Sequence, residues 1–253
     1  MRARQLATTI ILLFASTVVA QQRGKQPQLN QLMNAARKND LAQVRKLLAS
    51  GANVNERTNN GETALYEAIE RLNLNSDNLP VVKGLLDAGA DPNETSIFGS
   101  RPLMLSLTRD YGNPDVTLLL LRSGAHVPRG CDRDDSSVSI AAQNGSANVV
   151  DALLKGGAAV NCQAVGGQTA FHWAAMNGFV DVVSVLLKGG ADPNLRNTEG
   201  KTPLDVAVVT NPDTRVQQQF ARTRDLLQTA LQNKNLPSSQ VTVPKKQGVR
   251  GEI

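Results

Sequence analysis

Acidic side chains gather once in this chain in a pattern that could bind a cation. Asp132, Asp134 and Asp135 lie close together, and carboxylate oxygens are ligands that Ca²⁺ prefers. An EF-hand loop beginning at Asp132 would need Gly at its sixth position and Glu at its twelfth, where Ser137 and Gln143 stand. We therefore expect a solvated turn here and no metal ion.

The remaining chemically active residue types also argue against catalysis. The two histidines, His126 and His172, lie far apart in the sequence, whereas zinc sites need clustered His and Cys ligands. Gly200-Lys201-Thr202 is similar to the end of a phosphate-binding loop, but Leu195 stands where that motif needs another Gly. No Ser or Cys nucleophile has a base and an orienting acid nearby in the sequence. We expect no enzyme activity and no cofactor, and we expect His172 to be a hydrogen-bonded core residue.

The first 20 residues have the pattern of a secretory signal peptide. Arg2 and Arg4 precede an apolar stretch from Leu6 to Val19, and Val18 and Ala20 are the small residues that a signal peptidase needs. The alternative is a membrane anchor, but an apolar stretch of about 14 residues is short of the roughly 20 that span a bilayer. We expect residues 1–20 to be cleaved and the protein to be secreted, or periplasmic if the source is a bacterium.

The charge gives little support for a nucleic-acid or membrane partner. The formal charge is +5, and loss of Arg2 and Arg4 leaves 25 basic against 22 acidic residues, or +3. Aromatic residues make up 3% of the chain, which suits a thin core of stacked helices built from Leu, Val and Ala. No later segment is long and apolar enough to span a membrane, so we expect no stable membrane insertion after cleavage.

One short phrase recurs five times and indicates how the chain is organised. The glycines that open it are spaced by 38, 35, 33 and 33 residues, and a period near 33 indicates a solenoid. The five copies are Gly51-Ala52-Asn53-Val54-Asn55, Gly89-Ala90-Asp91-Pro92-Asn93, Gly124-Ala125-His126-Val127-Pro128, Gly157-Ala158-Ala159-Val160-Asn161 and Gly190-Ala191-Asp192-Pro193-Asn194.

Two helices are expected between successive copies. Apolar residues before each phrase follow helical spacing, as Val180, Val183 and Leu187 do, and the Gly is typical of a left-handed helix cap. After each phrase comes a turn and then Gly-x-Thr in several copies, as in Gly167-Gln168-Thr169, where the Thr is a natural N-cap of a short helix.

This arrangement resembles the ankyrin repeat. Thr169-Ala170-Phe171-His172-Trp173-Ala174-Ala175 is similar to that family's signature, and Thr202-Pro203-Leu204-Asp205 is similar to a second copy. The resemblance implies an all-α solenoid of six helix-turn-helix units joined by short β-hairpin turns. The predicted parts are a flexible lead-in at 21–28, an array at 29–232 with units at 29–56, 57–94, 95–129, 130–163, 164–197 and 198–232, and a disordered basic tail at 233–253.

The two cysteines occupy the hairpin regions that open neighbouring units. Cys131 and Cys162 are the only cysteines, and an even number in an oxidising compartment favours pairing. Adjacent hairpins of such an array stack side by side, so a disulfide between them is one reading. The alternative is a pair of unlinked thiols.

The resemblance also implies where a partner would bind. Ankyrin-like arrays typically bind proteins through hairpin tips and the exposed face of each first helix. Ile97 and Phe98 are two large apolar residues at one tip, which either anchor a partner or fold back onto the second unit. Insertions at 71–79 and 109–114 and weak signatures in the third and fourth units place the predicted surface on the second to fourth units. The candidate partner-binding residues are Ile97, Phe98, Arg109, Tyr111, Arg133, Asp135, Asn144, Val165 and Met176.

These observations predict a non-enzymatic protein–protein interaction module that is monomeric. The alternative is an inhibitor or immunity-type protein that blocks one dedicated toxin or enzyme.

Overall fold

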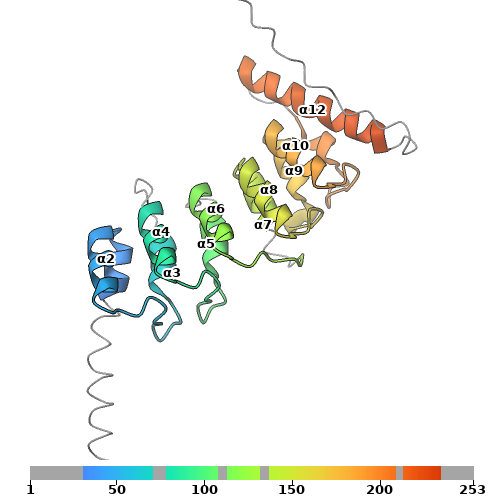
Figure 1. Ribbon diagram of the computed structural model, residues 1–253. Helices are drawn as coiled ribbons and strands as arrows, with labels where there is room; N and C mark the ends of the chain where they lie inside the picture. Colours follow the sequence, from blue (N-terminus) through green and yellow to red (C-terminus); the bar gives the residue numbers. More distant parts are fainter. Residues whose placement is uncertain (1–30, 71–77, 108–112, 132–136, 209–212, 235–253) are drawn as a thin grey trace, which may run out of the picture. The chain divides into compact units, whose positions relative to one another are not determined.

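A computed structural model of the chain describes residues 31–70, 78–107, 113–131, 137–208 and 213–234 (Figure 1). These residues form helices and turns, and none of them belongs to a β-strand. The chain divides into two compact units, the first ending at Val127 and the second beginning at Pro128. The predicted leader, lead-in and basic tail lie outside the described residues, apart from the last turn of the final helix.

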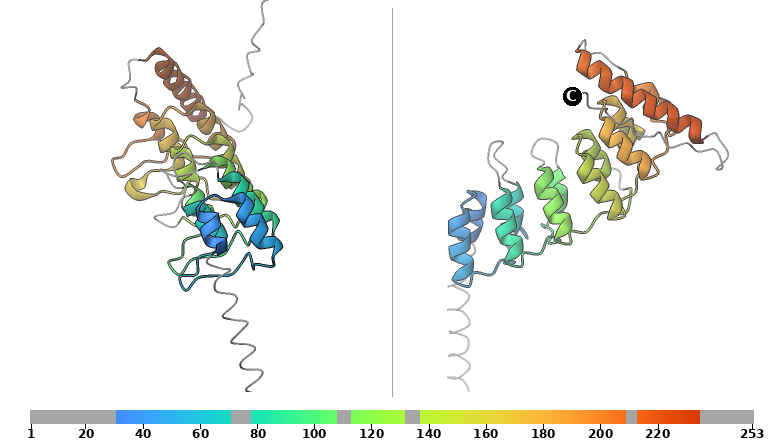
Figure 2. Two further views of the ribbon diagram at one scale, coloured as in Figure 1. Left: turned by 90° about the vertical axis from the view of Figure 1, so that its left-hand side faces the viewer. Right: turned by 45° about the horizontal axis from the view of Figure 1, so that its top comes forward.

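The first unit consists of helix pairs stacked in chain order. α4 packs between α2 and α6, and α3 packs against α5, so that like helices lie side by side (Figures 1 and 2). Its elements are a helix at 31–37, α2 (Leu41–Ala49), α3 (Ala64–Glu70), α4 (Leu79–Asp87), α5 (Pro102–Leu107) and α6 (Pro114–Arg122).

The second unit repeats this arrangement. α9 packs against α7 and α11, and α10 packs against α8 and α12. Its elements are α7 (Ser137–Gln143), α8 (Ala147–Lys155), the short 3₁₀ helix η1 (Val165–Gly167), α9 (Ala170–Met176), α10 (Val180–Lys188), α11 (Pro203–Val206) and α12 (Thr214–Lys234). Within the described ranges, no helix combines the length and the apolar character needed to cross a membrane. The predicted all-α array of helix-turn-helix units is confirmed.

Buried β-branched and leucine side chains line one face of each second helix from α4 to α10. Each of these helices buries two adjacent residues and a leucine three or four positions later, which is the spacing of one helix face. The buried sets are Val81, Val82 and Leu85 in α4; Val116, Thr117 and Leu120 in α6; Val149, Val150 and Leu153 in α8; and Val182, Val183 and Leu186 in α10.

The recurring Gly-Ala phrase closes each second helix in the same way. After α4, the Gly89 N–H donates to the Leu86 carbonyl at 3.0 Å and the Ala90 N–H donates to the Leu85 carbonyl at 3.0 Å. This pair of bonds is a Schellman motif, and it requires the left-handed conformation that Gly89 adopts at φ +89°. The same two bonds follow α2, α6, α8 and α10, so the sequence-predicted glycine caps are confirmed at all five places.

Threonine N-caps begin α3, α9 and α11, and one of these threonines is bonded to His172. The Thr169 Oγ1 accepts from the His172 N–H at 3.3 Å, and the His172 Nδ1 accepts from the Thr169 N–H at 3.2 Å. The His172 Nε2 lies 3.0 Å from the Lys201 carbonyl oxygen, so the neutral ring with its proton on Nε2 satisfies both contacts. Burial lowers the pKa of His172, against a smaller opposing effect of the Lys201 carbonyl. His172 is therefore the hydrogen-bonded core residue that the sequence predicts.

Asparagine side chains connect each Gly-Ala loop to the next one along the array. The Asn93 Nδ2 donates to the Gly124 carbonyl at 3.0 Å, and the Asn93 Oδ1 accepts from the His126 N–H at 2.7 Å. Asn55 makes the same two bonds to the loop at 89–91, and Asn161 makes them to the loop at 190–192. We call this paired contact the asparagine clamp. It holds neighbouring repeats in register with one side chain.

Loss of a clamp should destabilise the array. Asn93→Ala removes two hydrogen bonds between loops, and we expect it to lower the free energy of unfolding by about 1–2 kcal/mol in a urea titration. Asn194→Ala is the matched control, because Asn194 occupies the same repeat position but its side chain makes no hydrogen bond among the described residues. Equal effects of the two substitutions would contradict the assignment.

The buried histidine should make stability depend on pH. Its pKa is lowered in the folded state from the ordinary 6.5, so the unfolded chain binds the proton first. The stabilising effect of the neutral ring is complete above about pH 6.5 and is lost as the pH falls through the folded-state pKa, by at most about 1.4 kcal/mol per pH unit. Urea titrations at about pH 7.5 and 5.5 should show this loss in the wild type and less of it in His172→Gln. His126→Gln, at an exposed site, should behave like the wild type.

Candidate interaction surface

The turns between repeats form compact tips with a common backbone geometry. In the tip that begins at Thr58, the Thr58 N–H donates to the Glu62 carbonyl at 3.0 Å and the Gly61 N–H donates to the Thr58 carbonyl at 2.9 Å. The same pair of bonds closes the tips that begin at Ser96, Ala164 and Asn197. The predicted β-hairpins are thus tight turns in the described part of the chain, because each tip has too few residues to form paired strands.

Neighbouring tips are bonded to one another. The Ile97 N–H donates to the Asn60 carbonyl at 2.9 Å, and the Thr198 N–H donates to the Gly166 carbonyl at 3.0 Å. A Cβ atom on Gly167 would lie 2.9 Å from the Thr198 nitrogen, so only glycine fits where the next tip approaches. The tips therefore form a connected row of backbone in each unit.

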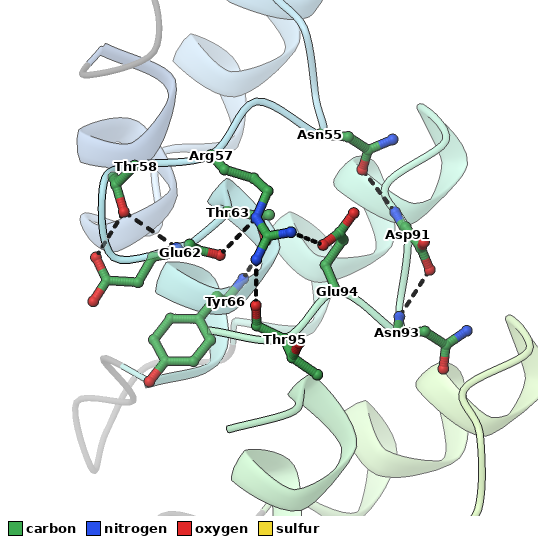
Figure 3. Close-up of polar contacts among 11 residues, drawn as sticks. Asn55, Arg57, Thr58, Glu62, Thr63, Tyr66, Asp91, Asn93, Glu94 and Thr95 are labelled. Atoms are coloured by element: carbon green, nitrogen blue, oxygen red, sulfur yellow. Dashed lines mark hydrogen bonds and ion pairs between the residues drawn. The ribbon is translucent and has the colours of Figure 1, made fainter. Parts of the chain in front are cut away.

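The three nitrogens of the Arg57 guanidinium group connect the first tip to the residues just before the second tip (Figure 3). Its Nη1 lies 2.8 Å from the Glu94 Oε2, its Nη2 donates to the Thr95 carbonyl at 2.5 Å, and its Nε donates to the Gly61 carbonyl at 3.3 Å. The ion pair is partly exposed, so its own contribution to stability is small. The contacts of Arg57 instead hold the backbone in place just before Ile97.

Ile97 and Phe98 are the most prominent apolar residues on this row. The two residues are 63% and 77% exposed, whereas the Ile97 backbone N–H is bonded to the Asn60 carbonyl. The sequence left two alternatives for this pair, which were to anchor a partner or to fold back onto the second repeat. In the structure only the backbone of Ile97 bonds to the second repeat. The two side chains project from a tip whose backbone is held in place.

The first helices of the first unit carry charged and phenolic groups that pair with one another. Arg37 pairs with the buried carboxylate of Glu67 through two contacts of 2.9 Å, and this pairing raises the pKa of the guanidinium. The Tyr66 hydroxyl donates to the Glu70 Oε1 at 3.3 Å, and burial, followed by the Glu70 charge, raises the pKa of that phenol. Glu70 itself is exposed, so α3 ends in negative charge.

In the second unit, three predicted partner-binding residues are exposed at the two ends of first helices. Val165 lies in the tip before α9 and is 75% exposed, and Met176 is the last residue of α9 and is 37% exposed. Asn144 is exposed directly after α7, which packs against α9. The length of α9, roughly 10 Å at 1.5 Å per residue, separates Val165 from Met176. They mark opposite ends of one helix and do not form a single cluster.

Four other candidate residues, Arg109, Tyr111, Arg133 and Asp135, lie outside the described residues. The acidic group at 132–135 does so as well. Among the residues that the structure describes, no three His, Cys, Asp or Glu side chains are grouped so that they could hold a metal ion.

The two cysteines are neighbours in the second unit. The Cα atoms of Cys131 and Cys162 lie 5.1 Å apart, within the range that a disulfide spans, and their sulfur atoms are at bonding distance. Cys131 is exposed and Cys162 is buried.

Two features of the surface were missed by the sequence analysis. Val208, after α11, is 58% exposed, and no periodic pattern marks it because α11 has only four residues. The second feature is the asparagine clamp, whose residues the sequence identified only as parts of a turn. The signal for it was present, because Asn ends four of the five Gly-Ala phrases.

Comparison with known proteins agrees with this geometry. A family model described as ankyrin repeats (3 copies) matches residues 24–134 and 138–235. The crystal structure of an ankyrin repeat domain from Acinetobacter baumannii AYE is similar, with a TM-score of 0.60 and 27% sequence identity, and the match covers 79% of this chain and 96% of that one.

Two curated relatives match over shorter segments. A fowlpox virus (strain NVSL) ankyrin repeat protein, FPV222, is 40% identical over 80 residues, which is 32% of this chain and 10% of that protein. The mitochondrial disaggregase of Bos taurus is 41% identical over 91 residues, which is 36% of this chain and 12% of that protein. The matched segment thus spans about a tenth of each of these relatives. Because the family model covers most of the chain, this protein belongs to the ankyrin-repeat family.

Proposed function

We propose that this protein is a non-enzymatic binding module that docks another protein on the tip carrying Ile97 and Phe98. Ankyrin repeats are generally protein–protein interaction modules, and the family is typically non-enzymatic. The observation that carries the proposal is the pair of exposed apolar side chains on a tip whose backbone is fixed.

The fixed backbone supports binding for a thermodynamic reason. A docking loop that must be ordered on association loses affinity to the ordering of its backbone and side chains. The bonds from Ile97 to Asn60 and from Arg57 to Thr95 order this tip in the free protein. Phe98 can then be buried in a pocket of the partner with little rearrangement, which is how aromatic anchors act in interfaces.

The second unit offers a separate set of contacts. Val165 and Met176 are exposed at the two ends of α9, and Asn144 follows α7. A partner that lies along α9 would contact all three, as partners of ankyrin-like arrays contact tips and first helices.

The compartment proposed for this activity is the periplasm or the extracellular space, where the protein acts as a monomer. The support is the pattern of the first 20 residues, with two arginines before an apolar stretch and small residues at its end. The cysteine pair fits an oxidising compartment.

Phe98→Ala tests the docking site. A pull-down of the mature chain from secreted or periplasmic material of its own source, followed by mass spectrometry, supplies the partner. Titration calorimetry should then show a loss of affinity of about 2 kcal/mol or more if Phe98 is a hot spot. The thermal midpoint should stay nearly unchanged, because the side chain is largely exposed in the free protein.

Two variants serve as controls for this experiment. Phe171→Ala removes a fully buried aromatic ring and should lower the thermal midpoint, and Glu199→Ala changes an exposed residue of the last tip and should affect neither quantity. Normal binding by a Phe98→Ala variant that melts early would show that Phe98 packs within the protein and that the surface is misplaced.

The proposed compartment leads to a second prediction. Cys131 and Cys162 should be disulfide-bonded in the exported protein, and the closed loop of about 32 residues should add roughly 3–4 kcal/mol in the chain-entropy model. Mass spectrometry after alkylation without reduction should find neither cysteine modified. Two alkylated thiols in the exported protein would refute both the bond and its use as support for the compartment.

A further inference from the structure

We propose that the Cys131–Cys162 disulfide is a redox-sensitive crosslink that replaces a missing asparagine clamp in the second unit. The proposal rests on the disulfide proposed above and on a gap in the otherwise regular clamp pattern.

The gap lies at Pro128. Asn55, Asn93 and Asn161 each clamp the Gly-Ala loop that follows, but the equivalent position in the third phrase is Pro128. Proline has no side-chain amide, so it can neither donate to the Gly157 carbonyl nor accept from the Ala159 N–H as the asparagines do at the equivalent positions. This pair of loop segments therefore lacks the contact that holds three others.

A second stabilising contact is missing from the same loops. In the phrases with Asn53, Asp91 or Asp192 at the third position, that side chain accepts from the backbone N–H two residues later, at 2.8–3.1 Å. Ala159 has no oxygen in its side chain, and Pro128 has no N–H to donate. Neither loop segment can form this internal bond.

The disulfide joins these segments. Cys131 is three residues after Pro128, and Cys162 directly follows Asn161. The bond thus runs between the stretch that begins at Pro128 and the residue that follows the loop at 157–161, the loop in which the clamp would have contacted Gly157 and Ala159. The disulfide therefore joins the two segments that lack the recurring asparagine clamp.

The bond is also placed so that a reductant can reach it. Cys131 is exposed and Cys162 is buried, so a dithiol can attack the Cys131 sulfur and release Cys162 as a thiolate. The second thiol of the reductant then attacks the reductant's own sulfur atom in the mixed disulfide. The oxidised dithiol leaves, and Cys131 is released. Two electrons pass from the dithiol to the cysteine pair, and its two protons end on the two cysteine thiols. After that step neither a clamp nor a crosslink holds segment 128–131 to segment 157–162.

Hydrogen exchange on the full mature chain, oxidised and then reduced with a dithiol, tests the proposal. Reduction should speed the exchange of the Gly157 and Ala158 amides, which donate to the Leu154 and Leu153 carbonyls, by about tenfold or more, because local opening sets their rate. The loop at 190–194, which Asn161 clamps, should change less. Unchanged exchange of the Gly157 and Ala158 amides would overturn the proposal.

A pair of substitutions at Pro128 separates the clamp from the loss of proline. Pro128→Asn supplies the missing amide and should reduce the effect of the reductant, whereas Pro128→Ala removes the proline without supplying an amide and should not. If reduction unfolds the whole unit, the thermal midpoints of the two reduced variants replace exchange as the measure, and Pro128→Asn should be higher. Equal behaviour of the two variants would refute the replacement of the clamp by the disulfide.

Discussion

The asparagine clamp is the contact on which the regularity of this array depends. A helix pair buries one apolar face against each neighbour, but apolar packing is not directional and does not fix the register of two repeats. The amide of Asn93 does fix it, because its donor and its acceptor each meet one backbone group of the next loop at 3.0 and 2.7 Å. The Schellman turn makes this possible by presenting the Gly124 carbonyl and the His126 N–H to the same side chain.

The positions of the tips depend on these loops. Each described tip begins three residues after the last residue of its Gly-Ala phrase, so a loop that is held in place also fixes where the next tip begins. Further bonds between tips, such as that from Ile97 to Asn60, extend the order to the outermost turn. Apolar side chains on a mobile segment lose affinity to the ordering of that segment on binding, whereas on an ordered tip they form a preorganised contact. The proposed function follows from this combination of exposed side chain and fixed backbone.

The features that depend on residues close in sequence were predictable from the sequence. The glycine after each second helix must adopt a positive φ, and the threonines before α3, α9 and α11 cap those helices, so period and residue type identified both features. The role of Asn55, Asn93 and Asn161 was not found, because it depends on which backbone groups of another repeat lie opposite the amide. The exposure of Phe98 was left open for a similar reason. Whether a ring at a turn packs or projects is decided by the neighbouring tip, and here Asn60 bonds to the backbone of Ile97 and leaves the ring free of the core.

The exchange rate of single amide protons measures the clamp most directly. The N–H groups of Asp91, His126 and Asp192 each donate to an asparagine Oδ1 at 2.7–2.8 Å, whereas Pro128 can offer no such acceptor to the equivalent N–H of Ala159. Exchange monitored by NMR in the oxidised protein, corrected for intrinsic rates, should show the three clamped amides protected well above Ala159. Similar protection of all four amides would contradict the account, because the register of the repeats would then be held by something other than the asparagine side chains.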